Sequence, residues 1–188
     1  MDKQVAILLA DGFEEGEAII ILDIFRRLQI NIEALSIGNQ LELTSYHNVK
    51  MQADALLKDR AATLYDAIIM PGGPQGARNL GNSEEVVEFV KKHLAADKYV
   101  CPFCSAGAHV MAKNNLLGSK KYTTSGKNYE LYNDGNYVDQ NIVIEGKLIT
   151  GKGLGVVFEY AFTLAALFAP IDKVKWEADH IYFYHWQP

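Results

Sequence analysis

The sequence predicts an α/β fold in which helices cover a mostly parallel β-sheet. Unbroken apolar runs, typical of strands buried on both faces, occur at residues 5–10, 67–70 and 99–103. Segments with helical periodicity separate these runs, and strands that alternate with helices favour a parallel sheet. Ligands of such folds bind where the loops at the carboxyl ends of the strands meet, so we expect the functional residues there.

The composition predicts one domain over residues 1–188, with an aromatic tail at residues 176–188. The 18 basic and 23 acidic residues give a net charge of −5 without a basic cluster longer than a pair, so we expect no nucleic-acid partner. The longest apolar stretch is interrupted too soon to span a membrane. The 2 cysteines are too few for a disulfide framework, which favours a cytoplasmic location.

The first helix is expected at residues 18–28, after a turn that follows the first strand. Three carboxylates, Glu14, Glu15 and Glu17, precede it, and the helix dipole alone favours acidic groups at this position. The helix is apolar nearly all round, so it needs a second cover besides the sheet. A second subunit is one candidate for that cover.

The next elements are a strand at residues 30–37 and a hairpin within residues 41–52. The buried strand at residues 67–70 then stops at a Pro-Gly-Gly-Pro sequence that contains Gly72 and Gly73. Two glycines at the end of a strand allow backbone N–H groups to face a ligand, as in an oxyanion hole. A simple connecting loop is the alternative. Neither interpretation is favoured by this short pattern alone.

The strand at residues 99–103 follows a helix that Ser83 is expected to cap. At Cys104 the pattern changes to small residues and then to a helical period. A strand that turns sharply into a helix presents its corner residue on an exposed elbow, as in the nucleophile elbow of hydrolases. The first N–H groups of the helix would favour thiolate over thiol. We therefore predict a low-pKa Cys104 at the carboxyl edge of the sheet.

Two other interpretations of this cysteine remain open. Cys104 can be a small buried apolar residue without chemistry, or it can pair with Cys101 in a dithiol redox motif. In a strand, three steps separate the two Cα atoms by roughly 10 Å, whereas a disulfide needs about 4.4–6.8 Å. The geometry therefore disfavours the dithiol.

The last third of the chain is expected to contain a hairpin within residues 141–150 and an apolar helix at residues 156–168. The glycine-rich turn between them does not follow the first strand with the dinucleotide-binding pattern, so we expect no nucleotide cofactor. His180 and His185 in the tail are five positions apart, which suits neither one helical face nor one strand face. Packing is therefore favoured over metal binding.

Four segments together resemble the ThiJ/PfpI superfamily, in the branch of the parkinsonism-associated deglycase. They are Ala-Asp-Gly-Phe-Glu-Glu-Gly-Glu-Ala (10–18), Met-Pro-Gly-Gly-Pro-Gln-Gly-Ala-Arg-Asn-Leu (70–80), Cys-Ser-Ala-Gly (104–107) and Ile-Thr-Gly-Lys-Gly-Leu-Gly (149–155). The resemblance covers residues 3 to 170 in order. It implies a flavodoxin-like three-layer sandwich, a homodimer whose interface includes most of residues 19–25, and a site that needs neither cofactor nor metal.

The resemblance also implies roles for single residues. Cys104 would be the reactive cysteine, and Glu17 would be a protonated acid that is hydrogen-bonded to it. Gly72, Gly73 and Ser105 would form the oxyanion and binding site. The chain departs from the family in three ways. It has one additional residue after Cys104, it lacks a proline after the small pair, and it lacks the histidine that some relatives have near residues 123–126.

These features predict a cysteine-dependent glyoxalase or deglycase that acts on reactive dicarbonyls or glycation adducts. An alternative of another class is an oxidative-stress sensor or chaperone in which Cys104 is oxidised without turnover. A cysteine peptidase is a third hypothesis, but it requires a histidine beside the cysteine. His109 is five residues from Cys104, so we expect it to face away and do not assign it as a base.

Overall fold

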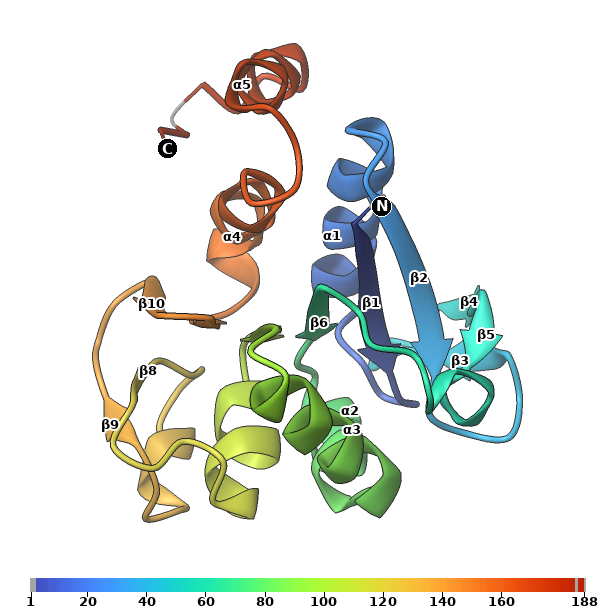
Figure 1. The fold of residues 1–188 in the computed structure, drawn as a ribbon, viewed down its shortest axis with the longest axis vertical. Coiled ribbons are helices and arrows are strands. Elements are labelled where there is room, and N and C mark those ends of the chain that lie inside the picture. Colours follow the sequence, from blue (N-terminus) through green and yellow to red (C-terminus); the bar gives the residue numbers. More distant parts are fainter. Residues whose placement is uncertain (1–2, 185, 188) are drawn as a thin grey trace.

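The fold is organised around one seven-stranded sheet with the order β10-β11-β7-β6-β1-β2-β5 (Figure 1). The computed structural model describes residues 3–184, 186 and 187. All neighbouring strands run parallel except the β10–β11 pair, which confirms the predicted α/β fold. The strands are β1 (Gln4–Leu9), β2 (Asn31–Ser36), β5 (Ala55–Leu56), β6 (Ala67–Met70), β7 (Tyr99–Pro102), β10 (Ile142–Glu145) and β11 (Leu148–Gly151).

Helices cover both faces of this sheet, because alternate side chains of each buried strand point to opposite sides. In β1, Val5, Ile7 and Leu9 belong to one core cluster, whereas Ala6 and Leu8 belong to the other. The first cluster includes side chains of α1 (Glu15–Arg27), α4 (Val157–Ala165) and α5 (Ile171–His180). The second includes side chains of α2 (Pro74–Asn82) and α3 (Glu84–Ala95). The result is the expected three-layer sandwich.

The apolar first helix is covered mainly by the chain itself. Ile21, Ile24 and Phe25 are fully buried, in the same cluster as residues of the sheet and of α4. Ile19, by contrast, is 47% exposed. Most of residues 19–25 are therefore covered within the chain, where α4 supplies the second cover, and the expected subunit interface stays a prediction for exposed side chains such as Ile19.

Smaller elements complete the fold. The expected hairpins are present as β3 (Glu42–Thr44) with β4 (Lys50–Gln52), and as β10 with β11. A short parallel pair, β8 (Lys121–Tyr122) and β9 (Asn136–Tyr137), forms a separate two-stranded sheet. Among the described residues, no helix has both the length and the apolar character needed to cross a membrane.

Two helices were not anticipated from the sequence. The helix α2 begins at Pro74, the last residue of the Pro-Gly-Gly-Pro segment. The fixed φ angle of proline suits the first position of a helix. The helix α5 lies partly within the aromatic tail, and the tail then returns so that Trp186 packs against Phe162, with ring centroids 5.7 Å apart. His185 lies outside the described residues, so its predicted packing role stays a prediction.

The burial of α1 predicts different costs for two substitutions of the same residue type. Ile24→Ala leaves a cavity between the sheet and α4 and should lower the free energy of unfolding by about 2–5 kcal/mol. Ile19→Ala should change it by less than about 1 kcal/mol. Urea unfolding at low protein concentration measures both. Equal losses for the two variants would contradict the assignment of α4 as the cover.

Candidate functional site

The chain turns sharply at Cys104, immediately after β7. Cys104 has a φ angle of 56°, a left-handed conformation that strains a residue with a side chain. Its N–H donates to the carbonyl of Gly151 at 2.8 Å, and its carbonyl accepts from the Thr124 hydroxyl at 2.8 Å. These bonds hold the strained backbone in place. The turn therefore has the geometry of the predicted elbow.

Glu17 and Cys104 meet at Gly72. The Glu17 side chain is buried, and its Oε2 accepts the N–H of Gly72 at 2.7 Å. A Cβ atom at Gly72 would lie 2.6 Å from Cβ of Cys104 and 3.1 Å from Oε2 of Glu17, so only glycine fits between them. The start of α1, the loop after β6 and the elbow therefore converge on one point, as the carboxyl ends of parallel strands predict.

The thiol and the carboxyl group lie beside each other at Gly72, and each changes the pKa of the other. Oε1 of Glu17 has no hydrogen-bond partner among the described residues. Burial raises the pKa of Glu17 to about 7, although the neighbouring Cys104 side chain and the N–H of Gly72 lower it. Burial also raises the pKa of Cys104 to about 12, and the charge of Glu17 adds to this effect. The prediction of a low-pKa thiol is therefore wrong. Burial and the charge of an ionised Glu17 raise the pKa of Cys104 by more than the N–H of Ser105, at the start of the following helix, lowers it. Near pH 7 the pair holds either one or two protons.

The three predicted binding residues have different surroundings. The N–H of Gly72 is engaged by Glu17, so the expectation that it faces a ligand is wrong. Gly73 and Ser105 both line a pocket at Cys104, and among the hydrogen bonds of the described residues the N–H of Gly73 has no acceptor. The N–H of Ser105 points at the Cys104 sulfur and lowers its pKa. Only Gly73 and Ser105 therefore remain as oxyanion donors.

The pocket at Cys104 has a volume of about 180 Å³, which suits a small molecule. Ser125 also lines it, and its side chain lowers the pKa of Cys104. This serine lies in the segment 123–126, where the family resemblance led us to look for a histidine. The sequence analysis did not assign the remaining residues of the pocket to the site; these are Glu14, Pro74, Arg78, His109 and Asn128.

His109 lines the same pocket as Cys104, so the expectation that it faces away is wrong. We expected a regular helix, in which a residue five positions on lies on the other side. The structure instead has a π-helical turn at Gly107–Met111 (η2), which contains more residues per turn. In a π-helical turn a residue five positions on returns to the same side, which agrees with the position of His109 in the pocket. Its Nδ1 is 3.0 Å from the Tyr132 hydroxyl.

Cys101 is separated from this chemistry. It lies within β7, is completely buried, and is unpaired like Cys104. Burial raises the pKa of its thiol far above the ordinary value. A helix that starts at Cys101, which a dithiol redox motif requires, is absent, since this part of the described chain is a strand. The dithiol interpretation is therefore not supported.

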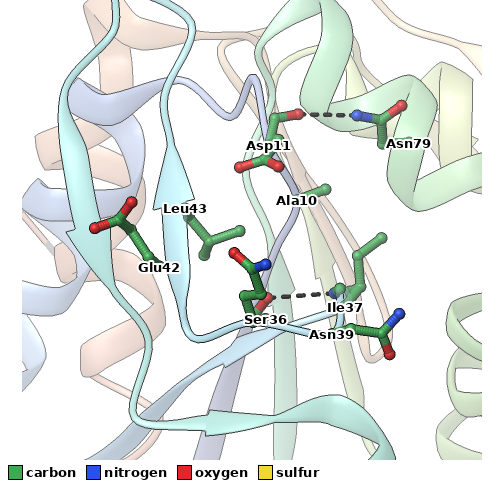
Figure 2. A pocket seen from close by; sticks show the side chains of 10 residues that line it. Ala10, Asp11, Ser36, Ile37, Asn39, Glu42, Leu43 and Asn79 are labelled. Carbon is green, nitrogen blue, oxygen red and sulfur yellow. Dashed lines mark hydrogen bonds between the residues drawn. The ribbon is translucent and has the colours of Figure 1, made fainter.

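A larger pocket of about 460 Å³ lies where β1 and β2 end, and Figure 2 shows its lining. The Asn79 amide donates to the Asp11 carbonyl at 2.9 Å. The polar side chains of the lining belong to Asp11, Ser36, Asn39, Gln40, Glu42 and Asn79. None of the predicted site residues lines this pocket. Because the smaller pocket contains Cys104, we take it as the candidate active site.

Among the described residues, one cluster has the geometry to hold a metal ion: Glu14, Glu15 and His47. Nδ1 of His47 is 2.8 Å from Oε1 of Glu15, so the two side chains satisfy each other without an ion. His47 is exposed. The cluster resembles an ordinary surface ion pair, and we assign no metal to it.

The buried carboxyl group predicts a pH dependence of stability. The pKa of Glu17 rises from 4.5 to about 7 on folding, so the folded state holds the proton more tightly than the unfolded state. The resulting stabilisation is complete below pH 4.5 and is lost as the pH rises through 7, by about 3 kcal/mol in total. Glu17→Gln removes this dependence. Relative to the wild type, the variant should therefore gain stability between pH 5 and pH 8 in urea unfolding, and parallel pH profiles would contradict a buried, neutral Glu17.

Residues 3–167 match the model of the DJ-1/PfpI family. Protein DJ-1 homolog B of Arabidopsis thaliana is 33% identical over 170 residues, which cover 90% of this chain and 39% of that protein. The match to homolog A of the same plant covers 43% of that protein, so the chain spans about two fifths of the length of these relatives. The glutathione-independent glyoxalase DJ-1 of Schizosaccharomyces pombe is 30% identical over 180 residues, with 90% of this chain and 93% of that protein covered.

A solved structure gives the same result. The crystal structure of a cysteine-to-alanine mutant of a DJ-1 superfamily protein from Salmonella typhimurium has a TM-score of 0.93 and 46% sequence identity. The match covers 96% of this chain and 98% of that one. These similarities agree with the resemblance in the four sequence segments. The chain belongs to the DJ-1/PfpI family.

Proposed function

We propose that the protein is a cysteine-dependent enzyme that converts small reactive dicarbonyls to 2-hydroxy acids without a cofactor. The observation that supports this function best is the buried Glu17, with a pKa of about 7, in contact with the Cys104 thiol. A carboxyl group that titrates near the working pH can both accept and return protons. The relative from Schizosaccharomyces pombe is named a glutathione-independent glyoxalase, which supports the same assignment.

The first step is addition of the thiol to the aldehyde carbon, C1. The Glu17 carboxylate accepts the thiol proton, and the thiolate sulfur forms a bond to C1. The carbonyl π electrons move to the oxygen, O1, which then takes the proton from Glu17. The N–H groups of Gly73 and Ser105 stabilise the negative charge on O1 while it develops. The product is a hemithioacetal, and Glu17 is again a carboxylate.

The second step moves hydrogen from C1 to the neighbouring ketone carbon, C2. Glu17 removes the proton on C1, which gives an enediolate, and then delivers it to C2. The proton on O1 passes to the ketone oxygen, O2, so that C1 becomes a thioester carbonyl. Water then adds to this carbonyl, the C–S bond breaks, and the thiol regains a proton. One dicarbonyl and one water give one 2-hydroxy acid without an external oxidant or reductant.

The deglycase hypothesis uses the same first intermediate, with an early glycation adduct as the substrate. The sensor or chaperone hypothesis also begins with Cys104, since the other thiol, Cys101, is fully buried. It differs in that oxidation consumes the thiol, so each molecule reacts once. A pocket of about 180 Å³ is too small for a peptide in extended conformation. We therefore do not propose peptidase activity.

A homodimer remains part of the proposal. Leu154 packs against the first turn of α1, where a Cβ on Gly16 would lie 2.7 Å from it. Leu154 is 48% exposed, and Ile19 and Phe158, each about one turn further along its helix, are also exposed. These three apolar side chains are candidates for a smaller subunit contact than residues 19–25. A cytoplasmic location, where both thiols stay reduced, is proposed with it.

Methylglyoxal consumption without glutathione or metal tests the proposed function. We expect multiple turnovers by the wild type, a loss of more than about 1,000-fold in kcat for Cys104→Ser, and a loss of about 100-fold for Glu17→Gln. Cys101→Ala is the matched control and should retain turnover, because its side chain does not reach the pocket. Absence of turnover in the wild type, with a single peroxide-sensitive thiol, would reject the enzyme and favour the sensor.

A further inference from the structure

We propose that His109 is a further catalytic residue, whose Nε2–H donates a hydrogen bond to the ketone oxygen of the bound dicarbonyl. This inference rests on the proposed function and adds a residue to it. It is based on three features of the structure: the position of the imidazole in the cysteine pocket, its fixed backbone, and its contact with Tyr132.

The backbone of His109 is fixed by direct packing against α2. A Cβ atom at Gly81 would lie 1.8 Å from the carbonyl oxygen of His109, so the two backbones touch without a side chain between them. His109 is only 3% exposed as a whole residue, and it lines the pocket together with Cys104. A substrate atom bonded to Cys104 is therefore enclosed in the same small space as the imidazole.

Tyr132 defines which ring nitrogen is available to a substrate. The Tyr132 hydroxyl lies 3.0 Å from Nδ1 of His109, and their rings meet edge to face with centroids 5.8 Å apart. We assign Tyr132 as the donor to Nδ1, which places the proton of a neutral imidazole on Nε2. Nε2 has no hydrogen-bond partner among the described residues. It is the nitrogen that is left for a ligand.

The surroundings of His109 favour the neutral ring. Burial lowers its pKa, and the positive charges of Arg78 and Lys113 lower it further. A neutral imidazole is a weak acid, so it can donate a hydrogen bond without losing its proton to the substrate. Neutral histidines polarise carbonyl groups in this way in other enzymes.

The hydrogen bond acts during the second step of the proposed reaction. As Glu17 removes the proton on C1, negative charge grows on O2, and Nε2–H stabilises it. The proton on O1 then passes to O2, and Glu17 returns its proton to C2. The imidazole gains and loses no proton overall. The addition of the thiol to C1 does not use this hydrogen bond.

Kinetics of three variants test this role. His109→Leu removes the donor and should lower kcat for methylglyoxal by about 100-fold. His109→Gln retains an N–H donor and should recover part of that loss. Tyr132→Phe loses the hydrogen bond to Nδ1 and should lower kcat by about tenfold. Tyr129→Phe is the matched control, because Tyr129 stacks on Tyr137 outside the pocket, and it should have wild-type kcat.

A second readout separates this inference from the proposed function. The rate of Cys104 alkylation by iodoacetamide needs no donor at O2, so it should stay within about twofold of wild type in His109→Leu. Full turnover by His109→Leu would overturn the role of His109 alone, as would a parallel loss of turnover and alkylation. Absence of turnover in the wild type would reject the proposed function itself.

The tautomer provides a test that is independent of activity. Nitrogen-15 NMR of the wild type should show His109 neutral at pH 7 with its proton on Nε2, and Tyr132→Phe should lose this preference. A proton on Nδ1 in the wild type would overturn the proposal, because Nε2 would then have no hydrogen to donate.

Discussion

The burial of the Glu17 carboxyl group beside the Cys104 thiol is the constraint on which the rest of the site depends. Two ionisable groups are buried together, and burial penalises the charge of each. One proton shared between them reduces that penalty, because at most one negative charge is then present. The backbone N–H of Gly72 orients the carboxyl group from the other side. This arrangement allows the thiol and the carboxyl group to be buried in the same pocket.

The fold meets the geometric requirements of that pair through close backbone approaches. The sheet brings the first helix, the loop after β6 and the elbow to one edge, but side chains at the wrong positions would keep them apart. The absence of a side chain at Gly72 lets the thiol and the carboxyl group meet. The π-helical turn after the elbow then adds His109 to the pocket. Local irregularities rather than regular helices therefore complete the site.

Much of this architecture could be predicted from the sequence. The buried strands and the turn at Cys104 follow from hydrophobic runs and from the order of loops along the chain, whereas the choice of Glu17 among three carboxylates came from the family resemblance. The cover of α1 could not be predicted, since periodicity shows that a face is apolar but not which segment packs on it. His109 was missed because its orientation depends on a π-helical turn, which hydrophobic periodicity does not reveal. The protonation states of Cys104 and Glu17 depend on burial, which cannot be inferred from the spacing of residues in the sequence.

Thiolate absorbance measured against pH tests the shared proton most directly, with Cys104→Ser as the blank. The account predicts that no Cys104 thiolate appears near neutral pH in the wild type, because Glu17 releases its proton first and burial keeps the thiol protonated until well above pH 9. In Glu17→Gln the thiolate should form at a pH lower by at least about one unit, since the negative charge that raises the pKa of the thiol is removed. A wild-type thiolate that forms near pH 7, or one with the same titration in both proteins, would contradict the account.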